Sequence, residues 1–352
     1  MATLRTSTRQ RLEQFLANTS CEANVQSVVT GIPMAAVASH LGVTAQTGLS
    51  PYARRAGVTF EKSLFEDDAA RLRAGLEAEG LLPVGSQGLL DLRLRQQGGQ
   101  SANLSEACEQ FETFLRQLAT PNAPAHSLIA GPAMMLPPSQ VVGDGLVAID
   151  VLVVDHHTTP GSVQLRVGEI KSYADRGGHT DRAALAAARA QAGLYLHVLR
   201  LTLARLDLAP HMVAADDGFL VLRSVTANFP RVRAPEELRW QAQRASMALT
   251  HLESVPRPKD DKPRRTKTSA RHLDLIAQAP KALQEGCLRF CELARHCHNC
   301  AHEQGDPIVL GEEVARLLPP GLTLTRVSEL LDGTTQPAND AEHALLRQIA
   351  SR

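Results

Sequence analysis

The sequence predicts an α/β protein of the α+β kind, with a small mixed sheet flanked by helices and a separate helical cap. A change of hydrophobic period carries this prediction. Helical spacing before about residue 120 gives way to short β-branched or apolar runs between residues 127 and 171. A strongly helical stretch and one more strand-like run follow. Four of the six cysteines fall within residues 287–300, which indicates a cysteine-bearing cap outside the sheet.

Helices are expected where alanine, leucine and other helix-favouring residues recur at helical spacing. These stretches are Thr8–Ala17, residues 51–80, Ser105–Leu118, Asp181–Leu206 and Pro235–Leu252. Strands are expected in apolar runs bounded by Pro, Gly, Asp or His. These runs are Ser127–Met135, Leu146–Val154, Val163–Lys171 and Gly218–Arg223. The second and third strands should pair antiparallel, and residues 18–50 read as an irregular segment that holds Cys21.

Four regions follow from these elements. Residues 1–50 contribute to the cap, residues 51–255 form the core, residues 256–272 form a basic linker, and residues 273–352 form the cap and a helical tail. The linker contains seven cations and almost nothing apolar. They are Arg257, Lys259, Lys262, Arg264, Arg265, Lys267 and Arg271. The sequence leaves two interpretations open: an arm that follows a phosphate backbone, or a solvated linker.

The overall composition limits the classes of function. Lys plus Arg equals Asp plus Glu at 37 each, so a nucleic-acid site would have to be local. The N-terminus lacks the apolar stretch of a secretory signal, and no apolar run approaches the roughly 20 residues that cross a bilayer. We therefore expect a cytoplasmic protein with no membrane partner, whose clustered cysteines bind metal rather than form disulfides.

The strand Val163–Lys171 ends with an acid and a base where a purely structural strand would carry Val or Leu. Because side chains alternate along a strand, Glu169 and Lys171 point to one side. Asp150, in the preceding strand, should lie close to Glu169. Two clustered carboxylates suit a hard cation such as Mg²⁺ or Mn²⁺. A neighbouring lysine can orient a metal-bound water or stabilise charge on a phosphate oxygen.

A polar pair follows on the helix Asp181–Leu206. Gln191 and Tyr195 are four residues apart, so they face one direction. This helix should pack beside the sheet, where the pair can touch the lysine or a substrate backbone.

These motifs together resemble the PD-(D/E)xK nuclease superfamily, in its RecB-type branch. The matching residues are Asp150, Glu169-x-Lys171 and Gln191-x-x-x-Tyr195, preceded by Gly57-Val58-Thr59-Phe60-Glu61, which is similar to the first acidic motif of that branch. The resemblance implies a restriction-endonuclease-like core. It also implies that Glu61, Asp150, Glu169 and the Ile170 carbonyl bind the metal, and that Lys171 is the catalytic lysine, supported by Gln191 and Tyr195.

The cysteines have the spacing Cys287-x3-Cys291-x5-Cys297-x2-Cys300. Soft thiolates at tight spacing favour Zn²⁺ or an iron–sulfur cluster. The RecB-type branch includes AddB-like subunits and CRISPR-adaptation exonucleases, in which one cysteine precedes the first acidic motif and three follow the core. That resemblance implies a structural [4Fe–4S] cluster, with Zn²⁺ as the alternative. The fourth ligand is either Cys21 or Cys300.

The resemblance implies a metal-dependent DNA nuclease, an exonuclease on single-stranded DNA or DNA ends. Two other functions stay open: a restriction-type endonuclease, and a non-catalytic DNA-binding subunit of a repair or defence complex. The sequence has no P-loop motif GxxxxGK[ST], so any unwinding would come from a partner such as a helicase.

Overall fold

The structure, a computed structural model, describes residues 8–44, 51–86, 88–120, 126–136, 145–159, 162–225, 229–255, 270–284 and 286–350. Six cations of the predicted basic linker lie outside these residues. They are Arg257, Lys259, Lys262, Arg264, Arg265 and Lys267. Arg271, the seventh, lies in a helix.

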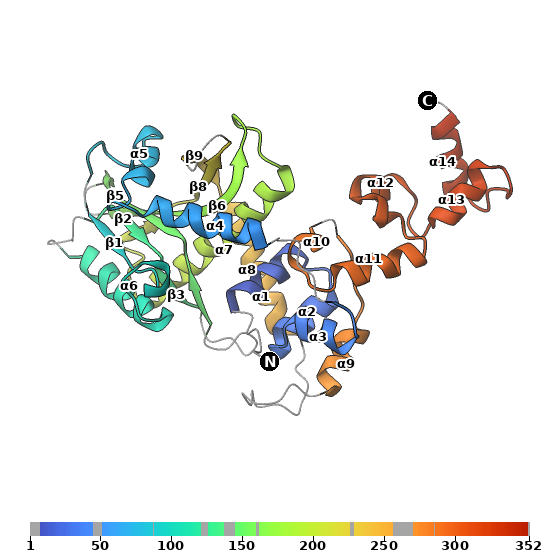
Figure 1. The fold of residues 1–352 in the computed structure, drawn as a ribbon, viewed down its shortest axis with the longest axis horizontal. Helices are drawn as coiled ribbons and strands as arrows, with labels where there is room; N and C mark the ends of the chain where they lie inside the picture. Colours follow the sequence, from blue (N-terminus) through green and yellow to red (C-terminus); the bar gives the residue numbers. More distant parts are fainter. Residues whose placement is uncertain are drawn as a thin grey trace. The chain divides into compact units, whose positions relative to one another are not determined.

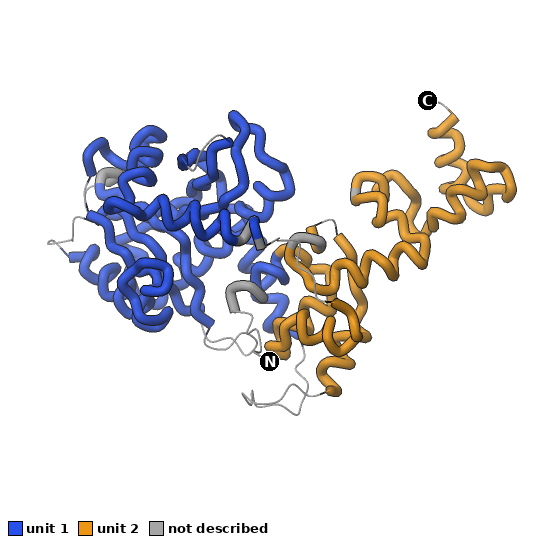
Figure 2. The backbone as a smooth tube through the Cα atoms, viewed as in Figure 1, with its two compact units in different colours: residues 1–16, 49–261 blue, residues 17–48, 262–352 orange. Residues whose placement is uncertain are grey.

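The chain forms two compact units, which Figure 2 colours separately. Unit 1 comprises residues 1–16 and 49–261, and unit 2 comprises residues 17–48 and 262–352. Unit 2 is therefore assembled from two segments that are far apart in the chain.

Unit 1 contains the sheets and the helices around them. Its helices are α1 (Thr8–Ala17), α4 (Pro51–Leu64), α5 (Ala70–Ala78), α6 (Leu104–Leu118), α7 (Arg182–Arg205) and α8 (Arg239–Ser254), with a 3-10 turn η1 (Arg95–Gln97). Its strands are β1 (Leu89–Asp91), β2 (Leu128–Ala130), β3 (Ala133–Met135), β4 (Leu146–Ala148), β5 (Val151–Thr159), β6 (Ser162–Asp175), β7 (Met212–Ala214), β8 (Asp217–Ser224) and β9 (Pro230–Glu237).

The main sheet is mixed, as the sequence predicts. Its strand order is β1-β2-β5-β6-β8-β9, and β7 pairs with the first half of β6. β6 pairs antiparallel with β5 and parallel with β8, so the strand that carries the predicted site lies in the middle of the sheet. β3 and β4 form a separate two-stranded sheet.

Helices cover both faces of the main sheet (Figure 1). One face packs against α4 and α5 through a cluster that includes Phe60, Leu72, Val151, Ile170 and Phe219. On the other face, Leu220 and Leu222 pack against Leu185 and Ala188 of α7. Because side chains alternate along β6, Ile170 lies on the face that α4 covers, and Glu169 and Lys171 lie on the face that α7 covers.

The predicted strand Leu146–Val154 is broken in two, which the sequence did not indicate. β4 pairs with β3 and β5 pairs with β2, so both halves keep antiparallel partners in different sheets. Main-chain hydrogen bonds continue across the bend, from Gly131 N to Asp150 O (3.0 Å) and from Ile149 N to Pro132 O (2.9 Å). Asp150 thus lies at the bend rather than inside a strand.

Unit 2 is helical. Its elements are α2 (Glu22–Thr30), α3 (Met34–His40), α9 (Ala270–Gln278), α10 (Cys287–Phe290), α11 (Ala294–Glu303), η2 (Pro307–Leu310), α12 (Glu312–Leu317), α13 (Leu324–Leu331) and α14 (Asp340–Ala350). The expectation of an irregular segment over residues 18–44 is wrong, because α2 and α3 occupy most of it. Both pack against α9, and this tertiary packing outweighs the weak helix propensity of the Val and Thr residues in α2.

Within the described ranges, no helix combines the length and the apolar character needed to cross a bilayer.

Candidate active site

β6 places the predicted acid and base on the sheet face that α7 covers. Glu169 and Lys171 pair in register with Leu220 and Leu222, which pack against α7. Glu169 is fully buried and forms an ion pair with Lys171, whose side chain keeps 27% of its surface exposed. A carboxylate at this depth is costly without a cation beside it, and Lys171 supplies that cation.

Asp150 joins this pair because of the bend between β4 and β5. Val151 pairs with Gly168 on β6, so Asp150 lies beside the Glu169–Ile170 step. Its Oδ2 atom accepts a hydrogen bond from Ile170 N at 2.9 Å. Asp150 is thus fixed to the main chain between the acid and the base.

A chain of two hydrogen bonds leads from the lysine to Gln191 and then to Tyr195 on α7. Lys171 Nζ donates to Gln191 Oε1 at 2.7 Å, and Gln191 Nε2 donates to Tyr195 OH at 2.7 Å. Gln191 and Tyr195 are both buried. The structure therefore brings together five of the predicted residues, which we call the acid–lysine site. They are Asp150, Glu169, Lys171, Gln191 and Tyr195.

Electrostatics keep the lysine positively charged. Burial opposes the ammonium form, but the carboxylates of Glu169, Asp150 and Glu13 outweigh it and raise the pKa of Lys171 above its usual range. Glu13 lies on α1 and was not predicted. Nothing in the sequence connects the helix Thr8–Ala17 to the strand Val163–Lys171, so only the fold reveals this neighbour.

Glu61 is the predicted ligand that does not form a metal-holding group with Asp150 and Glu169 among the described residues. It lies half-buried on α4, which approaches β6 closely one turn earlier: a Cβ on Gly57 would lie 3.3 Å from Ser172 Oγ. Among the residues that the structure describes, no group of three or more His, Cys, Asp or Glu side chains is arranged to hold a metal ion. The donor chemistry of Asp150 and Glu169 suits a hard cation, but Glu61 does not complete a three-carboxylate set.

Four of the predicted cysteines belong to the core of unit 2. Cys21, Cys287 and Cys291 are buried in one apolar cluster, and Cys297 packs against it. We call these four the cysteine cluster. Cys300 is not part of this core; its sulfur lies 3.8 Å from His296 Nε2. The sixth cysteine, Cys108, is a buried residue of α6, and all six are free thiols.

Burial makes the thiols of the cysteine cluster poor acids. It raises the pKa of Cys291 to about 12 and that of Cys297 to about 11, and it raises the pKa of Cys287 as well. Soft metal centres bind thiolates and displace these protons, so four sulfurs in one core suit such a centre by donor type. Among the described residues, these cysteines do not form a group arranged to hold a metal ion.

Asn18 connects the two segments of unit 2 next to these cysteines, a contact that no local sequence pattern predicts. Its side chain is buried and donates to Ala282 O at 2.6 Å and to Cys287 Sγ at 3.2 Å. Its main-chain oxygen accepts from Asn24 Nδ2 at 3.3 Å. Asn18 therefore links the chain just before α2 to the chain just before α10.

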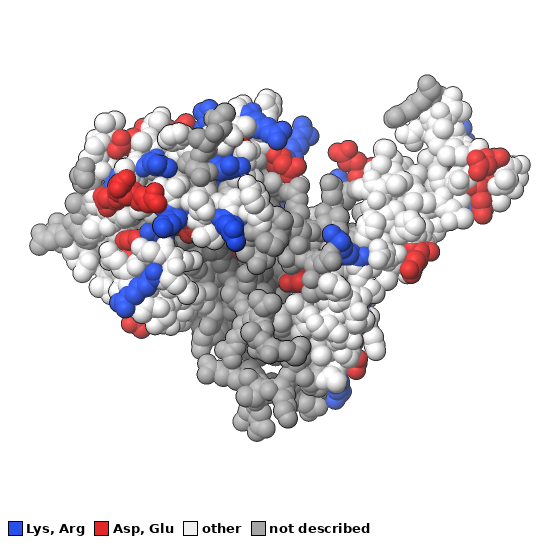
Figure 3. All heavy atoms as spheres, viewed as in Figure 1, with Lys and Arg blue, Asp and Glu red and all other residues white. Residues whose placement is uncertain are grey.

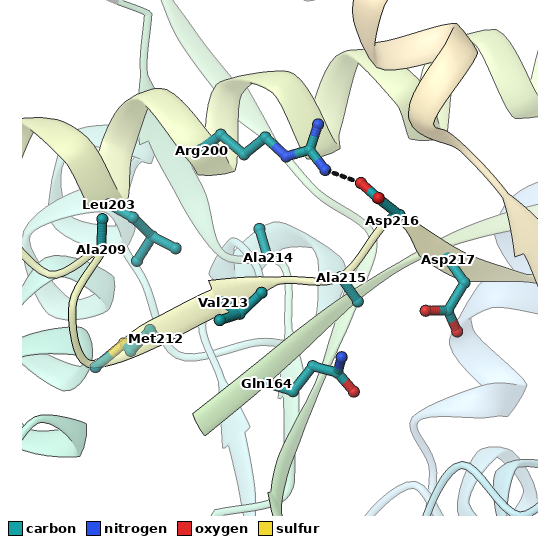
Figure 4. Close-up of a pocket in the computed structure, with 10 residues that line it drawn as sticks. All are labelled: Gln164, Arg200, Leu203, Ala209, Met212, Val213, Ala214, Ala215, Asp216 and Asp217. Carbon is teal, nitrogen blue, oxygen red and sulfur yellow. Dashed lines mark hydrogen bonds and ion pairs between the residues drawn. The ribbon is translucent and has the colours of Figure 1, made fainter. Parts of the chain in front are cut away.

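One hollow on unit 1 lies away from the residues of the acid–lysine site. It has a volume of about 600 Å³ and lies along β7 and the start of β8. Figure 4 shows Arg200 reaching from its helix to Asp216, with Asp217 and Gln164 on the strands nearby. Asp217 is paired in turn with Arg166 at 3.1 Å. The charges around the hollow are therefore paired, Arg200 with Asp216 and Arg166 with Asp217. We assign the chemistry to the acid–lysine site instead.

We compared the chain with known protein families, proteins and structures. No family model, no curated protein and no solved structure matches this chain.

Proposed function

We propose that this protein is a metal-dependent DNA nuclease that hydrolyses phosphodiester bonds in single-stranded DNA or at DNA ends. The observation that carries the proposal is the acid–lysine site. It combines a fully buried carboxylate, a second carboxylate fixed to the adjacent main chain, and a lysine held between them and a buried glutamine. A purely structural strand gains nothing from this arrangement, because apolar side chains would pack there at lower cost.

Each residue has a role that follows from its contacts. The Lys171 ammonium stabilises the negative charge that develops on a phosphate oxygen as water attacks. Gln191 holds Lys171 in place, and Tyr195 fixes the orientation of Gln191. Asp150 and Glu169 would hold a Mg²⁺ or Mn²⁺ ion, which when bound supplies an activated water and neutralises charge on the phosphate. Glu61 remains a sequence-based prediction for a further ligand.

We also propose that the cysteine cluster holds a structural [4Fe–4S] centre, with Zn²⁺ as the alternative. Four sulfurs in one apolar core support this proposal. The position of Cys300 outside that core favours Cys21 as the fourth ligand.

Cleavage of end-labelled DNA tests the nuclease proposal. Anaerobically purified protein is incubated with Mn²⁺ and with linear or circular single-stranded DNA, beside Lys171→Ala and the control Arg116→Ala, which changes an exposed cation on α6. We expect wild type and the control to degrade linear DNA, and Lys171→Ala to be slower by at least about 10²-fold. Cleavage of the circle would identify an endonuclease. If wild type cuts none of these substrates, the proposal is wrong.

A further inference from the structure

The sheet face that carries Lys171 extends to the edge of the sheet. Lys171 pairs in register with Leu222 of β8, and Leu222 pairs with Arg231 of β9. Residues in register across neighbouring strands share a face, so Lys171 and Arg231 lie on the same side. Because β6 and β9 are separated by one strand, their backbones lie about 10 Å apart at the row that contains Lys171 and Arg231.

A rigid turn follows Lys171 on the same strand. Arg176 and His179 exchange main-chain hydrogen bonds at 3.2 and 3.3 Å around Gly177 and Gly178. Both glycines have left-handed backbones, at φ 64° and 89°, which a side chain at either position would disfavour.

Asp175 and Arg233 hold this turn from two sides. Asp175 Oδ1 accepts from Gly178 N at 3.2 Å and from the Thr180 hydroxyl at 2.9 Å. Arg233 of β9 donates to Gly178 O at 3.1 Å. The turn is therefore fixed to the edge strand, and α7 begins directly after it at Arg182.

The cations of this region fall into two groups. Arg189 pairs with the buried Glu236 at 2.6 Å, and Arg233 pairs with Glu236 at 3.3 Å and with Asp175 at 3.9 Å. A second group is exposed and, within the described part of the chain, forms no ion pair with a carboxylate. Its members are Arg176, Arg182 and Arg231. In Figure 3, Lys and Arg side chains are visible along the upper edge of unit 1, above the strands labelled β8 and β9 in Figure 1.

We propose that Arg176, Arg182 and Arg231 form a binding surface for the phosphate backbone of single-stranded DNA next to Lys171. The surface carries three positive charges on a turn, on the first residue of α7 and on an edge strand, and hydrogen bonds hold the turn to that strand, which suits a polyanion. The inference rests on the proposed nuclease function, because this surface would bind the part of the DNA strand that lies outside the acid–lysine site. Guanidinium groups bind phosphate oxygens through paired hydrogen bonds, so we expect the backbone rather than the bases to be recognised.

Binding of a fluorescein-labelled oligothymidine tests the surface, with no divalent metal added so that the strand is not cut. The test protein carries Arg176→Gln, Arg182→Gln and Arg231→Gln. The control carries Arg95→Gln, Arg116→Gln and Arg244→Gln, which removes the same charge from other exposed positions of unit 1. Fluorescence anisotropy gives Kd between 50 and 200 mM salt, a range over which phosphate contacts lose roughly an order of magnitude or more in affinity.

We expect Kd of the test protein to rise at least about 10-fold, and the salt slope to fall by about 2, as the loss of three phosphate contacts requires. The control should change Kd less than about 3-fold. Replacing the same three residues with Lys should restore most of the affinity. Equal losses in test and control proteins, or no loss in the test protein, would overturn the inference while the nuclease proposal stands. Absence of DNA binding by wild type would overturn both.

Discussion

The acid–lysine site of unit 1 and the cysteine cluster of unit 2 both gather residues from distant parts of the chain, but by different interactions. In unit 1, polar groups contact one another: Asp150 accepts from a main-chain amide, and Lys171 contacts both Glu169 and Gln191. In unit 2, the cysteines share an apolar core, and burial keeps the pKa values of three of the thiols high.

This difference indicates that the two sites depend on ligands to different degrees. The acid–lysine site is organised by the sheet and α7 alone, so its geometry should persist without metal. If the cysteine cluster holds the proposed metal centre, part of the folding free energy of unit 2 should come from that centre.

Removing the metal centre should have the largest effect, and only on unit 2. Structural metal sites of this kind contribute on the order of 10 kcal/mol. After oxidative removal of the centre, we expect limited proteolysis to cut within residues 17–48 and 262–352 while residues 51–255 stay protected. Mass spectrometry of the fragments measures this, and iron, sulfide and zinc analysis identifies the centre. Cys291→Ser should lose the metal and Cys108→Ser should keep it. Equal protection with and without metal would contradict the contrast.

Breaking the ion pair of the acid–lysine site should have the next largest effect. Lys171→Ala leaves Glu169 buried without its cation, and loss of one partner from such a pair costs about 3–5 kcal/mol. The double variant Glu169→Leu/Lys171→Met removes both charges and should recover most of that loss. Urea unfolding followed by circular dichroism measures the difference. A double variant as unstable as the single one would mean that the pair serves the fold rather than a reaction.

Asn18 should matter for unit 2 even though it is not a ligand. Asn18→Leu keeps the approximate shape of the side chain but removes donors to Ala282 O and Cys287 Sγ. Loss of these buried bonds should cost about 1–3 kcal/mol. Hydrogen exchange of α2 and α10 reports the change. Gln26→Leu is the matched control, because Gln26 donates to Glu22 on its own helix, at 2.8 Å.

The smallest expected effect concerns Cys108, the cysteine of unit 1. Burial, followed by the charge of Glu112, raises the pKa of Cys108 to about 11. Because only the thiolate reacts, alkylation by iodoacetamide should be slow at pH 7.5 and accelerate about tenfold per pH unit until about pH 11. Glu112→Gln removes the smaller cause and should speed the reaction only a few-fold. Peptide mapping measures both rates. Fast alkylation of Cys108 at pH 7.5 would show that unit 1 opens as readily as metal-free unit 2.

The predictable parts of the fold are those in which the local pattern and the tertiary structure agree. The helix Thr8–Ala17 has the predicted bounds, and β5 and β6 form the predicted antiparallel pair. β9 escaped prediction because Pro230–Glu237 contains two prolines and four charges, and an edge strand tolerates both. Its last residues fall within the predicted helix Pro235–Leu252, but that helix starts at Arg239.

The candidate site shows the same division. Alternation along β6 and the four-residue spacing on α7 are local features, so the sequence could indicate that Glu169 and Lys171, and likewise Gln191 and Tyr195, point together. The bend at Asp150 and the approach of Glu13 depend on how α1 and the two sheets pack, which no local pattern contains.

The division of unit 2 into two segments has a consequence for synthesis on the ribosome. Residues 17–48 emerge first, but their packing partners come only after residues 49–261. At about 5–20 residues per second, that interval lasts roughly 10–40 s. Throughout it, Met34, Val37 and Ala38 lack the C-terminal side chains that bury them in the finished protein. A nascent chain stalled in this interval would expose these apolar side chains, and α2 and α3 are too short to persist as helices without their packing partners.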